Sequence, residues 1–507
     1  MWLIVMLLSE NRGRSALIWS CGIAALGATA WYNYHIYPWM LDDAFIAFRY
    51  VDNFAAGHGF VYNIGERVEG YTSFLWVLLL GLGRMAGLET VLISKILGAL
   101  FGVATIGVLM NVHRYFPAFN RESGAVAALF LGTCGVFMPW LGSGMEVTLS
   151  TLLTLATLVL YVNAINGDER PSLFMIVGVF LALTVMTRPE GALLVILLMI
   201  DCGIRSWKER KKSILFMALP AAALYLPYFL WRYFYYGYFF PNTFYAKVGF
   251  TGEQIIRGLN YSQSVILPIF ILLILSVYAL IRVWPALKLK GKYILPIFAL
   301  VHAIFVILVG GDIMPAFRFF VPIIPILALI AATCVPTLAR RKIYLFLLLT
   351  LTGAYNIYQT LDHSSITYHI QIDHVASDGK KVGLWLKENV SPGTLLATNA
   401  AGAVPYYSGL PTIDMLGLND LHIAHKKITD MGSGAPGHEK GDGKYVLSRK
   451  PDLIQFFSSV GSLYPSFRSD HELWELQEFH ERYTPRVADV SGLENGAVFY
   501  VRRSDIP

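Results

Sequence analysis

The sequence predicts a polytopic α-helical membrane protein that ends in a separate α/β domain. Three observations support this fold class: 55% of the 507 residues are hydrophobic, only 15% are charged, and apolar runs alternate with short basic loops. Soluble domains carry about 25% charged residues, and the mean hydropathy of this chain is +0.54. Because the basic residues gather between apolar runs, the net charge of +6 indicates membrane topology and no nucleic-acid partner.

Apolar runs recur through the first part of the chain. A helix needs about 20 apolar residues to cross about 30 Å of hydrocarbon. About eleven runs approach that length, and we expect spans at 16–38, 92–112, 123–141, 146–166, 171–187, 190–204, 213–231, 262–283, 292–309, 318–336 and 341–359.

The distribution of basic residues predicts the orientation of these spans. If the chain starts inside, every strongly basic short loop falls on the cytoplasmic side, as the positive-inside rule requires. The basic loops all fall on the cytoplasmic side only if the apolar segment 74–88 lies in the membrane interface and does not cross the membrane. Its Gly81, Gly83 and Arg84 agree with that interpretation.

The chain divides into two expected domains. Residues 1–360 form the membrane domain, with a first outer loop at 40–91, and residues 361–507 form an extracytoplasmic domain. The second part is polar and rich in glycine. A helical face in 372–389 and short apolar runs at 394–398, 453–457 and 497–501 predict its mixed α/β content.

Ionisable and aromatic residues gather in the loops predicted to lie outside. Carboxylates near hydrocarbon are costly and tend to be functional, so the adjacent Asp42 and Asp43 at the end of the first span are the leading candidates. The other outer candidates are Arg49, Glu66, Arg67, Glu69, Tyr71, Glu146, Arg188, Glu190, Arg232, Asn242, Tyr245, Lys247, Asp312 and Arg318.

This residue set suits a lipid-linked sugar donor. Its phosphate needs cations that stabilise developing negative charge, and its acceptor hydroxyl needs a base within hydrogen-bond reach. Asp42 or Asp43 could be the base. Other interpretations stay open: the acidic pair could cap a helix or bind Arg49, and Glu146 and Glu190 could be charges favoured at helix N-termini.

Several segments carry a family resemblance. The run from Asp42 to Ser73 resembles the first-loop signature of terminal β-1,2-arabinofuranosyltransferases, which belong to the GT-C class of glycosyltransferases. The resemblance continues at Ser143–Glu146, Thr187–Gly191, Pro241–Lys247, Gly310–Arg318, Asp414–Asp420 and Gly437–Asp442.

The resemblance implies a GT-C helical bundle in a bacterial inner membrane, with an active site on the periplasmic side. It implies a polyprenyl-phosphate sugar donor, D-arabinofuranose as a candidate sugar, and a cell-envelope glycan, lipid or protein as acceptor. A first-loop acid would act as base with inversion, and we favour Asp42 slightly over Asp43. Some members of the class use a divalent cation, which Asp42, Asp43 and Asp312 could bind, but we assign no metal ligand.

The assigned roles follow from these arguments. The donor phosphate and lipid ligands would be Arg188, Arg232, Lys247, Arg318 and Tyr245. The sugar or acceptor contacts would be Arg49, Glu66, Arg67, Glu69, Tyr71, Glu146, Glu190, Asn242, Asp312, Asn419, Asp420 and His438.

Two other function classes compete with a glycosyltransferase. A transporter or flippase of lipid-linked saccharides would show charged or broken helices at the bilayer midplane, and often repeated halves. A non-catalytic, membrane-anchored binding module would give no reason for ionic residues to collect at several separate outer turns.

Overall fold

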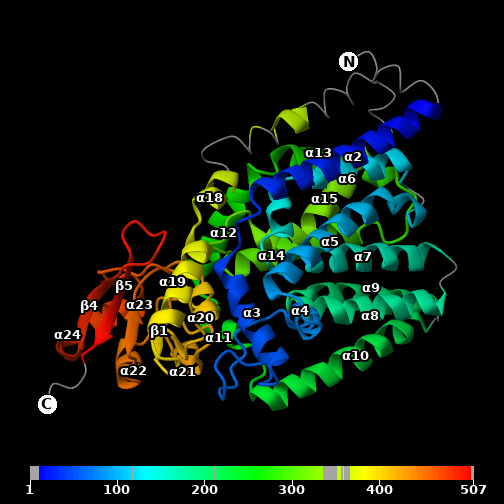
Figure 1. Cartoon of the computed structure of the whole chain (residues 1–507). Helices are drawn as coiled ribbons and strands as arrows, with labels where there is room; N and C mark the ends of the chain where they lie inside the picture. Colours follow the sequence, from blue (N-terminus) through cyan, green and yellow to red (C-terminus); the bar gives the residue numbers. More distant parts are fainter. Residues whose placement is uncertain are drawn as a thin grey trace.

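A computed structural model describes residues 11–116, 119–167, 170–209, 212–334, 351–355, 358 and 366–503. Figure 1 shows a bundle of helices with a smaller, sheet-containing unit at one end. The helices of the first part are α2 (Asn11–His35), α3 (Asp42–Ala55), α4 (Phe74–Met85), α5 (Thr90–Met110), α6 (Arg121–Gly132), α7 (Val147–Asn166), α8 (Pro171–Thr187), α9 (Gly191–Glu209), α10 (Ser213–Tyr236), α11 (Asn242–Lys247), α12 (Gly252–Ile266), α13 (Phe270–Arg282), α14 (Ile294–Leu308) and α15 (Ile324–Ala332), with short 3-10 helices at Val112–Arg114, Met138–Leu141, Trp284–Ala286 and Arg318–Ile323.

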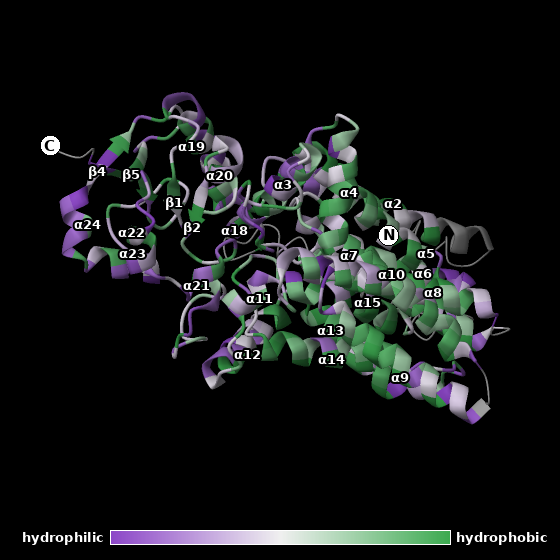
Figure 2. Ribbon diagram, turned by 90° about the horizontal axis from the view of Figure 1, so that it is seen from below, coloured by the Kyte–Doolittle hydropathy of each residue, from purple (hydrophilic) through white to green (hydrophobic). Residues whose placement is uncertain are grey.

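The bundle has the apolar character of a multi-pass membrane protein (Figure 2). Among the described residues, α5, α7 and α10 are each long and apolar enough to cross a membrane alone, and α12 with α13 passes the same test as a bent pair. Shorter apolar helices lie at Phe74–Met85, Pro171–Thr187, Ile294–Leu308 and Arg318–Ala332. The count of about eleven crossings stays a prediction.

Two expected spans are not single straight helices. The segment 262–283 is divided between α12 and α13, which meet at an angle of 92°. Pro268 lies in this break, and proline removes a backbone donor and clashes with the preceding turn. The segment 123–141 ends its α-helix at Gly132 and continues as turns and a 3-10 helix that contains Pro139. Of the expected span 341–359, the structure describes only 351–355 and 358, so this span stays a prediction.

The second part contains a five-stranded sheet in the order β2-β1-β3-β5-β4. Its strands are β1 (Leu396–Thr398), β2 (Thr412–Asp414), β3 (Leu453–Gln455), β4 (Tyr483–Ala488) and β5 (Ala497–Arg502). Strand β1 pairs in parallel with β2 and β3, whereas β5 runs antiparallel to β3 and β4. The expected domain boundary between residues 360 and 361 falls outside the described residues and stays a prediction.

Helices accompany this sheet. They are α18 (Ile366–Ile372), α19 (Val375–Asn389), α20 (Ala403–Ser408), α21 (Leu421–His425), α22 (Gly443–Ser448), α23 (Arg468–Trp474) and α24 (Gln477–Arg482). Helix α20 packs against both α19 and α3, and α21 packs against α11. These contacts bring the sheet-containing part against α3 and α11, which places the candidate site.

Candidate functional site

Asp42 connects the first helical turn of α3 to the sheet-containing part. Its carboxylate accepts hydrogen bonds from the backbone N–H groups of Gly402 (3.1 Å) and Ala403 (2.8 Å). Burial raises the pKa of Asp42 to about 7, the two backbone donors oppose that rise, and the charge of Asp43 adds to it. Since both carboxylate oxygens bind backbone groups, Asp42 has the contacts of a docking residue.

Asp43 faces the bundle instead. Its carboxylate lies 3.7 Å from a guanidinium nitrogen of Arg318, which is a loose ion pair. The same arginine makes a tight pair with Asp312, with 2.5 Å between Nε and Oδ2. Arg318 is buried, whereas the Asp43 side chain is 24% exposed, so Asp43 keeps access to an incoming molecule.

A second ionic group adjoins Arg318. Arg188, which follows α8, binds Glu146 at 2.7 Å and Glu190 at 2.6 Å. The Phe319 ring connects the two arginines, because both guanidinium carbons lie 5.3 Å from its centroid. Cations over an aromatic face are attracted by the ring quadrupole. Sequence reasoning missed Phe319, and its position directly after Arg318 was the only signal.

Lys247 and His438 complete the cluster. The charges of Asp43, Arg318, Asp312 and Arg188 all act on Lys247, and burial lowers its pKa. Burial also lowers the pKa of His438, whose charged neighbours are Asp43, Lys247 and Asp312. We name as the central cluster the residues Asp43, Glu146, Arg188, Glu190, Lys247, Asp312, Arg318 and His438. Four segments at helix ends in the bundle, the first turn of α3 and one loop of the sheet-containing part supply them.

Other candidates from the sequence lie in contacts that join parts of the fold. Arg49 donates to the backbone carbonyls of Tyr62, Pro405 and Leu410 at 2.7, 2.9 and 2.7 Å, and it does not pair with Asp42 or Asp43. The structure therefore does not support the interpretation in which Arg49 neutralises the acidic pair. Its role is to hold the first loop against α20.

Glu69 and Arg232 form a buried pair away from the central cluster. Their charged atoms approach to 2.6 Å, and the side chains are 4% and 5% exposed. Arg232 also donates to the carbonyl of Phe239 at 2.9 Å. Its expected contact with the donor phosphate stays a prediction.

The remaining expected contacts also have partners within the protein. Four of them make hydrogen bonds: Tyr71 with Tyr236, Asn242 with the backbone carbonyls at 417, 418 and 420, Asn419 with Asp414 and Tyr50, and Asp420 with Tyr445. Two lie against aromatic rings, Tyr245 on His425 and Arg67 over Tyr235. Glu66 forms an ion pair with Arg449. Their expected contact with a sugar or acceptor stays a prediction.

The acidic residues do not form a ready cation site. Asp42 binds Gly402 and Ala403, whereas Asp312 is paired with Arg318. Among the residues that the structure describes, no group of three or more His, Cys, Asp or Glu side chains is arranged to hold a metal ion. Asp42 and Asp312 thus have partners within the protein, and we assign no metal ligand.

Comparison with solved structures identifies the fold. The chain matches ArnT from Cupriavidus metallidurans bound to undecaprenyl phosphate, with a TM-score of 0.58, 14% identity, and coverage of 80% of this chain and 86% of that one. The apo structure of the same protein gives a TM-score of 0.51 with 14% identity, over 74% and 81% of the two chains. The chain shares the fold of ArnT. ArnT belongs to the GT-C class, so the helical GT-C fold implied by the motifs agrees with this finding.

Sequence comparisons agree with the resemblance. The terminal β-(1→2)-arabinofuranosyltransferase of Corynebacterium glutamicum is 28% identical over 331 residues, covering 57% of this chain and 47% of that protein. The protein of the same name from Mycobacterium tuberculosis is 29% identical over 256 residues, covering 47% and 40%. The chain therefore spans about half the length of these relatives. Residues 364–501 match a family described as a domain of unknown function, DUF8728.

Proposed function

We propose that the chain is a GT-C glycosyltransferase of the bacterial inner membrane. In this proposal it transfers a sugar from a polyprenyl-phosphate donor to a glycan, lipid or protein acceptor on the periplasmic side. The observation that carries the proposal is the central cluster, in which the partly exposed carboxylate of Asp43 lies beside buried Arg318 and the half-buried cations of Arg188 and Lys247. The names of the relatives make D-arabinofuranose the first sugar to test.

Asp43 is the better candidate for the base. Both oxygens of Asp42 bind backbone N–H groups, whereas Asp43 makes only a loose pair with Arg318 and is partly exposed. Neighbouring residues of a helix point about 100° apart, so the two acids separate into a docking residue and a reactive one. This assignment reverses the slight preference for Asp42 drawn from the sequence.

The reaction then assigns one task to each charge. Asp43 accepts the proton of the acceptor hydroxyl while the acceptor oxygen bonds to the anomeric carbon from the face opposite the phosphate. The bond from the anomeric carbon to the phosphate oxygen breaks, and polyprenyl phosphate leaves with the bonding electrons. Arg188, Lys247 and Arg318 stabilise the charge that this phosphate gains. Inversion at the anomeric carbon follows from this single displacement.

The lipid part of the donor needs apolar surface beside the cluster. At the end of α10, Phe234 and Phe239 are 77% and 58% exposed. They are close in sequence to Lys247, which supports this aromatic segment as the contact for the polyprenyl chain. Burial of apolar surface is worth about 25 cal/mol per Å², so a long polyprenyl chain could supply much of the affinity.

The test is transfer by the purified protein in nanodiscs. Radiolabelled polyprenyl-phosphoryl arabinofuranose is supplied together with cell-envelope acceptor fractions, and polyprenyl-phosphoryl sugars of other kinds are compared in parallel. We expect transfer that requires Asp43 and that releases polyprenyl phosphate. Absence of transfer from every polyprenyl-phosphate sugar by the wild-type protein would contradict the proposed function.

A further inference from the structure

A loop of the sheet-containing part reaches back to the bundle. We call residues 430–440 the docking loop; it packs on the turn before α12 and on the first residues of that helix. Thr251 donates its hydroxyl to the carbonyl of Met431. A methyl group at Gly249 would lie 2.4 Å from Met431 Cγ, so the two segments are in close contact.

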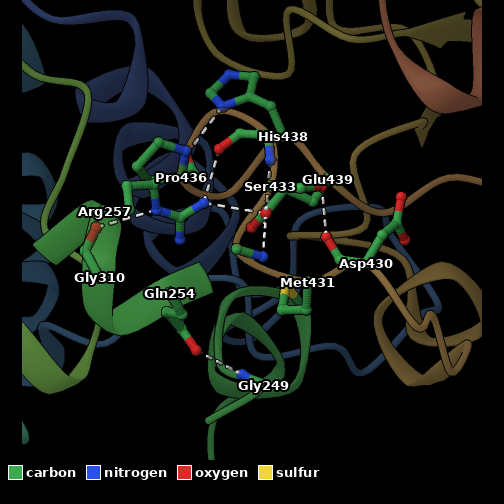
Figure 3. A network of polar contacts seen from close by, with 12 residues as sticks. Gly249, Gln254, Arg257, Gly310, Asp430, Met431, Ser433, Pro436, His438 and Glu439 are labelled. Atoms are coloured by element: carbon green, nitrogen blue, oxygen red, sulfur yellow. Dashed lines mark hydrogen bonds and ion pairs between the residues drawn. The ribbon is translucent and has the colours of Figure 1, made fainter. Parts of the chain in front are cut away.

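Arg257 of α12 is the main polar link between the docking loop and the bundle (Figure 3). Its Nε donates to the carbonyl of Gly310 at 3.1 Å, in the turn that leads to Asp312. Another nitrogen of the same guanidinium donates to Gly434 O at 2.7 Å and lies 3.0 Å from Glu439 Oε1. One side chain thus fixes the docking loop and the 310–318 turn at a defined separation.

Glu439 is the partner that gives the docking loop its shape. Its side chain is 2% exposed, and the same Oε1 accepts hydrogen bonds from the backbone N–H groups of Gly432 and Gly434. A buried carboxylate needs such partners. Arg257 and the two amides therefore hold the segment just before and at Glu439 in one conformation.

This segment delivers His438 and Gly437 to the central cluster. A methyl group at Gly437 would lie 2.9 Å from Lys247 Cε, and Gly437 has a φ of +78°, which favours glycine. The Nδ1 of His438 lies 3.0 Å from the carbonyl oxygen of Pro436. A carbonyl oxygen only accepts, so Nδ1 carries the proton and Nε2 of the neutral ring is a hydrogen-bond acceptor.

We propose that Arg257 is a positioning residue that sets the docking loop so that His438 Nε2 accepts a hydrogen bond from a hydroxyl of the acceptor beside Asp43. The inference rests on the proposed function and deepens it, because it assigns the acceptor side of the site to the docking loop. The acceptor class that follows is a polyhydroxylated one, such as a glycan, with at least one hydroxyl next to the one that reacts.

The experiment compares Arg257→Gln, Arg257→Lys and His438→Ala in nanodiscs. Arg502→Gln is the control, since Arg502 pairs with Asp452 at 2.5 Å within the sheet-containing part and its partners lie outside the docking loop and the predicted site. Two readouts are used: steady-state kinetics with donor and acceptor varied separately, and hydrogen–deuterium exchange of the amides in 430–440 without substrate.

We expect Arg257→Gln and His438→Ala each to raise the acceptor KM about tenfold, the size of one lost hydrogen bond, with the donor KM unchanged. Of these two variants, only Arg257→Gln should speed amide exchange in 430–440. Arg257→Lys should show smaller changes in both acceptor KM and exchange than Arg257→Gln. The double variant, Arg257→Gln with His438→Ala, should have the same acceptor KM as His438→Ala. Arg502→Gln should change neither readout.

Unchanged exchange in both Arg257 variants, or faster exchange with an unchanged acceptor KM, would overturn the positioning role. Those results leave the proposed transfer intact. Loss of the proposed function would show differently, as a wild-type protein that transfers no sugar. If Arg257→Gln does not fold, Arg257→Lys decides, because it keeps the charge but cannot bind Gly310, Gly434 and Glu439 together.

Discussion

Replacing each acid of the pair separately should give two distinct defects. In Asp43→Asn the proposed reaction loses its base, and general-base catalysis contributes about 10²–10⁴ in rate. At 1.36 kcal/mol per tenfold, this is about 3–5 kcal/mol of barrier. Asp43 makes only a 3.7 Å ion pair with Arg318, so the same substitution should leave the melting temperature nearly unchanged.

Asp42→Asn should behave in the opposite way. In the wild type, the N–H groups of Gly402 and Ala403 each have a carboxylate oxygen as acceptor. The amide of the variant keeps only one oxygen and directs its NH₂ group at the other N–H. A buried donor without a partner costs about 1–3 kcal/mol. We expect a lower melting temperature and a kcat close to wild type for the molecules that remain folded.

The assay measures both quantities on the same nanodisc preparations. Transfer is followed as release of polyprenyl phosphate at saturating donor, and unfolding is followed by the fluorescence of intrinsic tryptophan. A loss of kcat in Asp42→Asn larger than that in Asp43→Asn, without a difference in melting temperature, would refute the division of roles and return the base to Asp42.

Four further expectations test other parts of the fold. Arg318→Lys should raise the donor KM about tenfold, because lysine lacks the guanidinium fork that binds phosphate in a bidentate way; an unchanged KM would exclude Arg318 as a ligand. Glu69→Gln should cost about 3–5 kcal/mol in denaturant unfolding by leaving buried Arg232 unpaired, whereas a pure change of KM would place Glu69 in the sugar site. Asp42 should contribute a fall in the unfolding free energy as pH rises from 3.8 to about 7, since burial raises the pKa of Asp42 in the folded state and that state then holds the extra proton; in Asp42→Asn this contribution to the slope should disappear. Gly402→Ala should separate the two parts of the chain, seen as faster proteolysis between them, because its methyl would lie 2.1 Å from the Asp42 backbone oxygen.

The sequence predicted which residues gather but not how they pair. Charges at membrane boundaries must find partners or water, and the positive-inside count placed the relevant turns on one side. Glu146, Arg188, Asp312 and Arg318 do meet in the structure. The roles within the acidic pair were not readable, because the partner of Asp42 lies 360 residues further along the chain.

The sequence does not show which partner each arginine takes. Arg49 and Arg232 donate to backbone carbonyls, and Arg232 also pairs with Glu69. Arg188 and Arg318 pair with carboxylates. Composition cannot separate an arginine that serves the fold from one that serves a ligand. The sequence analysis did not name Arg257. This residue lies in α12, just before the expected span 262–283, and its partners are far from it in sequence.

Charge balance within the central cluster explains why the base should lie beside the phosphate ligands. Four carboxylates, those of Asp43, Glu146, Glu190 and Asp312, face the cations of Arg188, Lys247 and Arg318. A sugar phosphodiester brings one negative charge, and the polyprenyl phosphate that leaves carries about one more.

An unbalanced gain of charge would be costly in a buried site. In the proposed reaction Asp43 loses its charge to the incoming proton as the phosphate gains one, so the total in the cluster stays constant. Arg318 can then exchange its loose contact with Asp43 for the phosphate as Asp43 becomes neutral. Both oxygens of Asp42 already accept hydrogen bonds from backbone N–H groups, and Asp42 makes no ion pair with Arg318 that it could exchange for the phosphate in this way.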